Sequence, residues 1–283
     1  MKTKKLLFGL AISSLIFGFT ACKKDNSTSS ADNEIETTIE ISTDQAVADN
    51  LTEDANDIFM EAAAENGLTG ETPVSPFESM GILGCSQVTI TPLVGFPKTI
   101  VINFGTGCAS ANGIVRKGKI FISLSDSLRK PGSVSVLTFD GYYVGGFKKE
   151  GTITWTNTST AEKKGWQRKV ENGKITAPTG KYWLHSGIKN VVQTAGYSTP
   201  RNLLDDEFSI TGNSSCTNAK GINRTSTILE ALQKKTICEN ITKGKVEFKG
   251  PNHSAIIDFG NGDCDRAATI SIDGGTAVTF LLR

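Results

Sequence analysis

The chain has 283 residues, 30 Lys and Arg against 29 Asp and Glu, and 29 glycines. A near-neutral charge without a basic cluster excludes DNA and RNA as expected partners, because Lys and Arg must neutralise the phosphate backbone. Abundant Gly, Thr, Ser, Ile and Val is typical of short strands joined by tight turns.

The chain begins with a basic head of three lysines, an apolar run over residues 6–19, and Ala21 directly before Cys22. This order predicts a secretory signal peptide over residues 1–21, whose cleavage leaves Cys22 as an N-terminal residue that receives acyl chains. The apolar run is shorter than the roughly 20 residues that span a bilayer. An unlipidated secretory signal is the alternative. Acyl chains on Cys22 would make a membrane the first expected partner.

Residues 22–44 are rich in Ser, Thr, Asn, Asp and Glu, which predicts a flexible tether. The next segment, 45–67, has helical periodicity. Its apolar stripe is Val47, Leu51, Ala55, Ile58 and Ala62, and Asn66-Gly67 is a stop signal. We expect an amphipathic helix whose stripe packs on a sheet.

Five cysteines follow Cys22, and an oxidising envelope favours their pairing. Strand-like segments on either side of Gly95-Phe96 form a hairpin that brings Cys85 opposite Cys108. A second hairpin about residues 250–253 brings Cys238 opposite Cys264. Opposed positions on antiparallel strands lie near disulfide range. The sequence therefore predicts two disulfides and leaves Cys216 as a free, buried thiol.

The two hairpins are also alike, since I-V-I-N-F-G-T-G-C at 100–108 matches A-I-I-D-F-G-N-G-D-C at 255–264. Another echo relates residues 147–157 to residues 208–218, with Gly151 and Gly212 at matching positions. These matches indicate degenerate repeats of a β unit.

The remaining chain, 84–283, reads as a long series of strands, with a short second helix expected at Thr227 to Lys235. Many strands after one helix predict a mainly β fold, with an antiparallel sheet that is either open or folded into a sandwich.

Candidate catalytic groups are sparse. Each of the two histidines, His185 and His253, is followed by Ser, but neighbours on a strand point to opposite faces and cannot act as base and nucleophile. The D-F-G tripeptide at 258–260 lacks every other kinase element. We therefore predict no catalytic residue and no cofactor.

Three oxygen donors near a turn, Asn261, Asp263 and Asp265, have the spacing of the first half of a calcium loop. The glycine and the terminal Glu of such a loop are missing, so no metal site is predicted.

Tyr182 and Trp183 are the candidate ligand-binding residues, because sugar rings stack on aromatic planes. A glycan-binding module that uses this pair predicts that both side chains lie exposed beside a shallow groove, and burial of both would rule it out. The second alternative, an envelope hydrolase, requires converging Asp, Glu or His side chains in a deep pocket, for instance His185 near His253 or a pair of carboxylates.

The C-K-K-D start at residue 22, the single early helix and the repeated I-x-F-G-x-G-C units resemble uncharacterised cell-envelope lipoproteins of the Bacteroidota. This resemblance covers most of the mature chain. It implies an outer-membrane location and a β-rich form, with the leaflet left open, and it supplies no catalytic residues. We expect a lipid-anchored protein with a non-catalytic binding or structural role, and a glycan or an envelope protein as its partner.

Overall fold

The computed structural model describes residues 30–69, 81–110, 113–199, 205–238 and 240–282. Among these residues it contains one helix and a 14-stranded antiparallel sheet, so the predicted mainly β class is confirmed. The sheet is open, which decides between the two predicted arrangements. Cys22 and the signal segment lie outside the described residues.

The helix α1 spans Ser30–Glu65. The strands are β1 (Gln87–Thr91), β2 (Lys98–Asn103), β3 (Cys108–Ala109), β4 (Val115–Leu124), β5 (Val134–Val144), β6 (Phe147–Asn157), β7 (Gly165–Thr176), β8 (Tyr182–Ala195), β9 (Glu207–Asn218), β10 (Asn223–Lys235), β11 (Lys243–Lys249), β12 (Ser254–Asn261), β13 (Ala267–Ile272) and β14 (Val278–Leu281).

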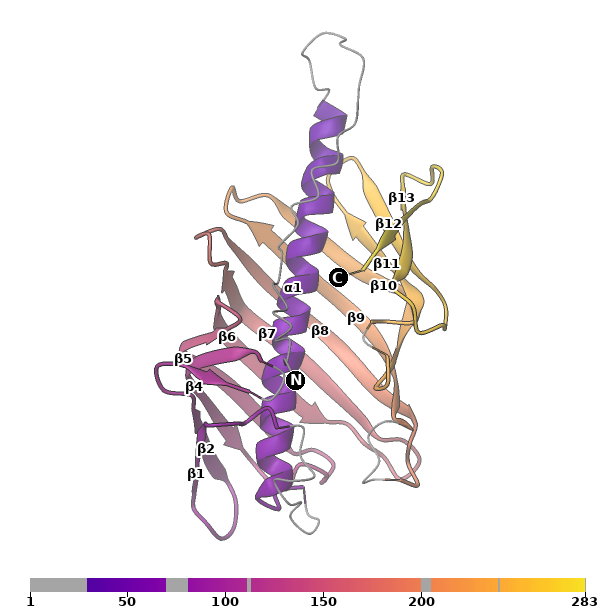
Figure 1. Cartoon of the computed structure of the whole chain (residues 1–283). Helices are drawn as coiled ribbons and strands as arrows, with labels where there is room; N and C mark the ends of the chain where they lie inside the picture. The colour runs from indigo at the N-terminus through magenta and orange to yellow at the C-terminus, as the bar shows by residue number, and fades with distance from the viewer. Residues whose placement is uncertain (1–29, 70–80, 111–112, 200–204, 239, 283) are drawn as a thin grey trace, which may run out of the picture.

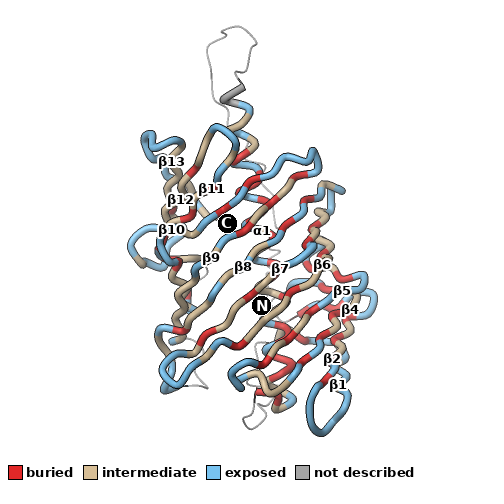
Figure 2. Tube along the Cα trace, turned by 180° about the vertical axis from the view of Figure 1, so that it is seen from behind, coloured by how far each residue is buried: buried red, intermediate tan, exposed pale blue. Residues whose placement is uncertain are grey.

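The strands follow one another through the sheet in sequence order from β1 to β14, except that the short β3 pairs beside β4. Figure 1 shows α1 crossing one face of the sheet, which we call the inner face. Figure 2 shows the opposite, outer face with α1 behind the strands. Buried and more exposed residues alternate along the strands, since successive side chains point to opposite faces.

The predicted apolar stripe of the helix packs on the inner face. Leu51, Ala55, Ile58 and Ala62 are buried in one hydrophobic cluster that also contains side chains of β2, β4 and β5. The helix stops where predicted, because Gly67 has a φ of 67° and Leu68 N donates to Ala63 O at 2.8 Å. This left-handed closure satisfies carbonyls at the helix end.

The predicted boundary between tether and helix is wrong, since α1 begins at Ser30 and includes residues 30–44. Ile41 is fully buried, and Thr38 accepts a hydrogen bond from Arg224 Nε at 2.7 Å. Glu34 accepts backbone hydrogen bonds from Asn252 and His253. Polar contacts with the sheet stabilise this part of the helix, and apolar periodicity cannot reveal them.

The predicted second helix at Thr227 to Lys235 is also wrong, because these residues belong to β10. The strand pairs with β9 on one side and β11 on the other. Ile228 and Leu232, four residues apart, both join the hydrophobic cluster of the last strands. A separation of four residues places side chains on one face of a strand as well as on one face of a helix, so this spacing alone does not distinguish the two.

The repeated glycines occupy positions that other residues cannot adopt. Gly151 and Gly212 have φ angles of 109° and 134°, and each lies at a register shift between strands. A Cβ at Gly151 would lie 2.6 Å from Asn172 O, and one at Gly212 would clash with the backbone of Ile188 and Lys189. The repeat thus reproduces the bulges that bend the sheet.

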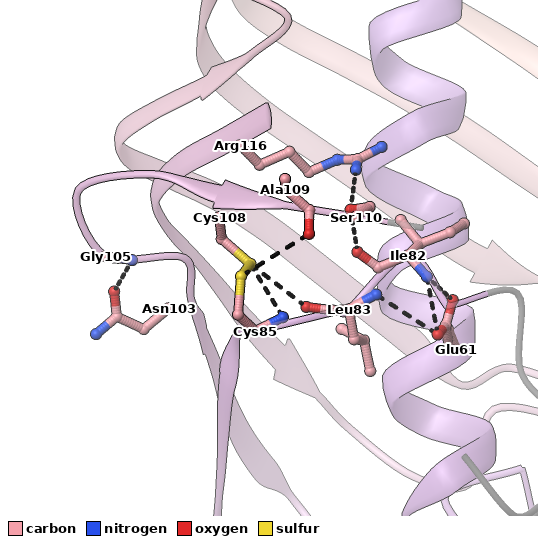
Figure 3. Close-up of a disulfide and its surroundings, with 10 residues drawn as sticks. All are labelled: Glu61, Ile82, Leu83, Cys85, Asn103, Gly105, Cys108, Ala109, Ser110 and Arg116. Atoms are coloured by element: carbon pink, nitrogen blue, oxygen red, sulfur yellow. Dashed lines mark hydrogen bonds between the residues drawn. A yellow bond between two sulfur atoms is a disulfide. The ribbon is translucent and has the colours of Figure 1, made fainter. Parts of the chain in front are cut away.

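Both predicted disulfides are present, Cys85–Cys108 and Cys238–Cys264, and Cys216 is free and buried as predicted. Figure 3 shows the first disulfide beside the C-terminal half of α1. The Glu61 carboxylate accepts hydrogen bonds from the backbone N–H groups of Ile82 and Leu83. This contact ties the segment before Cys85 to the helix.

Candidate binding surfaces

A row of cations on the inner face of the sheet meets carboxylates of α1. Arg116 of β4 pairs with Asp54, and Arg168 of β7 pairs with Asp49 and with Glu53. Lys189 of β8 also reaches Asp49, with Nζ 2.7 Å from Oδ2. We call these pairs the charged seam. Desolvation raises the pKa of Asp49, but Lys189 and Arg168 outweigh it and hold that pKa at about 2.

Lys149 of β6 lies beneath the helix beside the seam. Its ammonium donates to Thr52 Oγ1 at 2.9 Å and lies over the Phe139 ring. Burial and the nearby Arg168 together lower the pKa of Lys149 to about 7, against the opposing effect of Asp49 and Asp54. A lysine with this pKa is a familiar feature of catalytic sites. Here the side chain is buried beneath α1, and its ammonium is bonded to the Thr52 hydroxyl.

His185 lies on the same inner face, next to the seam. A narrow cavity lies beside it between α1 and the sheet. The volume that the centre of a water molecule can occupy in this cavity is about 10 Å³. That is space for about one water. Burial, together with the charge of Lys149, lowers the pKa of His185 to about 3. A neutral ring packed against Gly173, with no described nucleophile bonded to it, gives no catalytic pair.

His253 has a different environment. Its Nδ1 pairs with Asp273, and this hydrogen bond raises the pKa of the histidine. The charge of Glu34 in α1 also raises the pKa of His253. The pKa of His185 is influenced instead by the charges of Lys149, Asp49 and Arg168. The two histidines therefore have separate sets of partners, and the hypothesis that they converge in one pocket has no support from these contacts.

The candidate aromatic pair is divided between the two faces of β8. Trp183 is 2 % exposed and packs edge-on against the Phe147 ring in the core. Tyr182 is 37 % exposed on the outer face, where the Lys174 ammonium lies over its ring. Adjacent residues of a regular strand cannot line one surface together. The prediction of a joint Tyr182–Trp183 ligand platform is therefore wrong.

The other two motifs lie at the end of β12 and in the turn that follows it. In the described part of the chain no group of three or more His, Cys, Asp or Glu side chains is placed to hold a metal ion. Asn261 Oδ1 accepts from the N–H of Asp263, and Asp265 Oδ1 accepts from the N–H of Ala267, as in ordinary turns. The D-F-G tripeptide lies within β12 and its turn.

A shallow depression of about 310 Å³ lies over β8, β9 and β10. It is lined by Gly187 and by small side chains that each carry a hydroxyl or an amide group. These are Ser186, Asn213, Ser214, Ser215, Thr225, Ser226 and Thr227. Ser186, Asn213, Ser215, Thr225 and Thr227 alternate with buried neighbours and face the outer side. None of these lining groups is titratable near neutral pH, so the depression offers neutral donors and acceptors.

The hairpin between β1 and β2 exposes apolar side chains. Leu93 is 86 % exposed and Val94 is 88 % exposed. The Lys98 ammonium holds the turn together, because it donates to the carbonyls of Pro92 and Leu93 at 2.7 and 3.0 Å. Figure 1 shows this hairpin at the end of the molecule opposite the start of α1.

Sequence reasoning missed the charged seam and the hydroxyl-lined depression. The seam had a signal in the carboxylates Asp49, Glu53 and Asp54, but the sheet cations that meet them are distant in sequence. The depression had a signal in the Ser and Thr residues that alternate along β9 and β10.

Among the described residues, no helix is both long and apolar enough to cross a membrane. No protein-family model, curated protein or solved structure matches the chain.

Proposed function

We propose that this protein is a lipid-anchored protein of the cell envelope with a non-catalytic binding role, and that its ligand is a neutral glycan. The proposed anchor is an acylated Cys22, preceded by a cleaved signal segment, with the outer membrane as its location. Ser30, the first residue of α1, follows Cys22 by only a few residues, so the folded part would remain close to the membrane.

The depression over β8, β9 and β10 carries the binding proposal. Its volume of about 310 Å³ lies at the lower end of the range for small-ligand sites. Hydroxyl and amide groups without a charge suit the hydroxyls of a sugar, because each can both donate and accept a hydrogen bond. Tyr182 lies on the same face of β8 as Ser186, about 13 Å away along the strand.

Binding is tested by titrating the purified full chain with neutral oligosaccharides of the glucan, mannan and xylan types. We expect Thr225→Val and Ser215→Ala, which remove hydroxyls from the depression, to weaken binding at least 10-fold. Thr211→Val is the matched control, because Thr211 is an exposed residue of β9 outside the depression. If no oligosaccharide binds, or if all three variants bind equally, the glycan proposal is wrong.

The anchor is tested separately, by feeding cells an alkyne-bearing fatty acid and isolating the protein. We expect label on the native chain and none on Cys22→Ser, together with a shift of the variant from the membrane to the soluble fraction. An unlabelled native protein would contradict lipidation and would leave the binding result unaffected.

A further inference from the structure

The strand β1 forms one edge of the sheet and pairs only with β2 in the described part of the chain. Its sequence, Q-V-T-I-T, has no charged residue and no proline. Natural sheets usually protect an edge with Lys, Pro or a bulge, because unpaired N–H and C=O groups recruit another strand. The β1–β2 register runs without a bulge from Gln87 to Thr91. This edge therefore lacks the usual protection.

The side chains of β1 alternate between two environments. Val88 and Ile90 point to the inner face and pack at the margin of the main hydrophobic cluster, where both are only partly buried. Gln87, Thr89 and Thr91 are exposed on the outer face. Each face of the strand is therefore uniform, with apolar residues inside and neutral polar residues outside.

This pattern is self-complementary about Thr89. When two copies of β1 run antiparallel around a two-fold axis through Thr89, Val88 faces Ile90 of the partner copy and Gln87 faces the partner's Thr91. Thr89 faces its own equivalent. Apolar, polar and Thr–Thr cross-strand pairs of this kind are favourable, and no like charges oppose each other. The two-fold axis passes normal to the sheet, so both inner faces stay on the same side.

We propose that two copies of this chain associate through β1 and form one continuous sheet across the dyad at Thr89. The antiparallel continuation of β1 directs the exposed hairpin residues Leu93 and Val94 toward residues 84–86 of the partner copy, beside its Cys85–Cys108 disulfide. The dimer would thus cover part of the apolar surface that the monomer leaves exposed.

This association is compatible with attachment to a single membrane, although it does not depend on it. Rotation about an axis normal to the sheet leaves both α1 helices on the same side. The starts of the two helices then lie at equal height along the axis. Confinement on a surface raises the effective concentration and would strengthen an association through a short strand.

The test uses cysteine crosslinking of the purified full chain in mild detergent, with copper phenanthroline as the oxidant. We expect Thr89→Cys to give a disulfide-linked dimer, because residues facing each other on antiparallel strands lie about 4.5 to 5.5 Å apart between Cα atoms. Thr99→Cys is the matched control, since Thr99 is an exposed threonine on the neighbouring strand β2. We expect at least 10-fold less dimer from it.

A second measurement tests the interface without an introduced thiol. Thr89→Lys would place two ammonium groups across the dyad, so we expect the dimer fraction in native mass spectrometry to fall at least 10-fold. Thr99→Lys should leave that fraction unchanged. Equal crosslinking of the two cysteine variants, or a dimer that survives Thr89→Lys, would overturn the proposal. A product that forms only when Thr89→Cys is mixed with Thr279→Cys of β14 would also overturn it, since it indicates head-to-tail pairing.

Discussion

At the scale of single residues, the packing of α1 on the sheet shifts the pKa values of several ionisable side chains. Lys149 and His185 have pKa values of about 7 and about 3 because burial disfavours their charged forms. Asp57, in contrast, has its pKa raised to about 7 by burial and by Glu53 and Asp54. These shifts make stability depend on pH.

For His185, the folded pKa of about 3 lies below the ordinary value of 6.5, so the unfolded chain binds the extra proton first. Stability is therefore lost as pH falls from 6.5 toward 3. We expect the native protein to lose about 3 kcal/mol more than His185→Gln between pH 6.5 and pH 4. Urea unfolding at the two pH values measures the loss of stability in each protein. The opposite contribution of Asp57 is the same in both proteins, so it cancels when the two losses are compared. Parallel losses in both proteins would show that His185 is protonated in the folded state.

At the scale of elements, ion pairs supplement the apolar stripe that docks α1 on the sheet. Apolar packing explains how residues 48–63 dock on the sheet, because the helix contributes Ala48, Ile58 and Phe59 to the core there. The seam extends docking to polar positions such as Asp49 and Asp54. These charges are partly buried. When one partner is removed, the desolvation penalty of the other charge is no longer offset by an ion pair.

We expect Asp49→Asn to lower the free energy of unfolding by about 2–3 kcal/mol, because Lys189 loses its partner and Arg168 retains only Glu53. The control is Glu36→Gln, an exposed carboxylate of the same helix, with a change of about 0.5 kcal/mol or less. Urea denaturation at pH 7 distinguishes the two. Equal effects would mean that the seam contributes no more than an ordinary surface charge.

The bulge glycines are the second feature at this scale. At Gly151 an added Cβ meets backbone atoms of Asn172 and Gly173 at 2.6 to 2.8 Å, in addition to the strain of its positive φ. We expect Gly151→Ala to cost at least about 2 kcal/mol. Gly107→Ala should cost about 0.5 kcal/mol or less, since the nearest atom lies 4.0 Å away. Thermal unfolding measures both variants. If Gly151→Ala is as stable as the native protein, a steric clash does not explain why glycine is repeated at this position.

At the scale of the whole molecule, the described residues form one continuous sheet that carries two hydrophobic clusters. The first joins α1 to β2 through β9 and includes many fully buried side chains. The second lies on β9 to β13 and has four buried residues, Leu232, Val246, Phe248 and Ala255, surrounded by partly exposed ones. The sheet is therefore continuous in hydrogen bonding but uneven in packing.

This unevenness predicts the pattern of hydrogen exchange. We expect the amides of β11 to β14 to exchange through openings of lower free energy than those of β4 to β8, because fewer buried contacts hold these strands. Exchange followed by mass spectrometry at pH 7 measures both groups in one sample. Equal protection of the two groups would indicate that the sheet opens as a single cooperative unit.

Much of the fold was predictable where the determinants are close in sequence. Alternating strands, the helix stop at Gly67 and both disulfide pairs depend on neighbouring residues or on one hairpin, and all are confirmed. Predictions failed where distant segments decide. Residues 30–44 were expected to be a tether but are helical through contacts with Arg224 and Lys181, and Thr227 to Lys235 was expected to be a helix but pairs with β9 and β11.

The sequence by itself determined the mainly β class, the disulfide pairs and the free Cys216, because local alternation and hairpin geometry suffice for each. Only the tertiary structure decided that the sheet is open, that α1 lies on it through both apolar and charged contacts, and that Tyr182 and Trp183 face opposite sides. It also brought together the hydroxyls of the depression, from three different strands. These features depend on strand register and on which face is covered, and side-chain contacts between remote segments establish both.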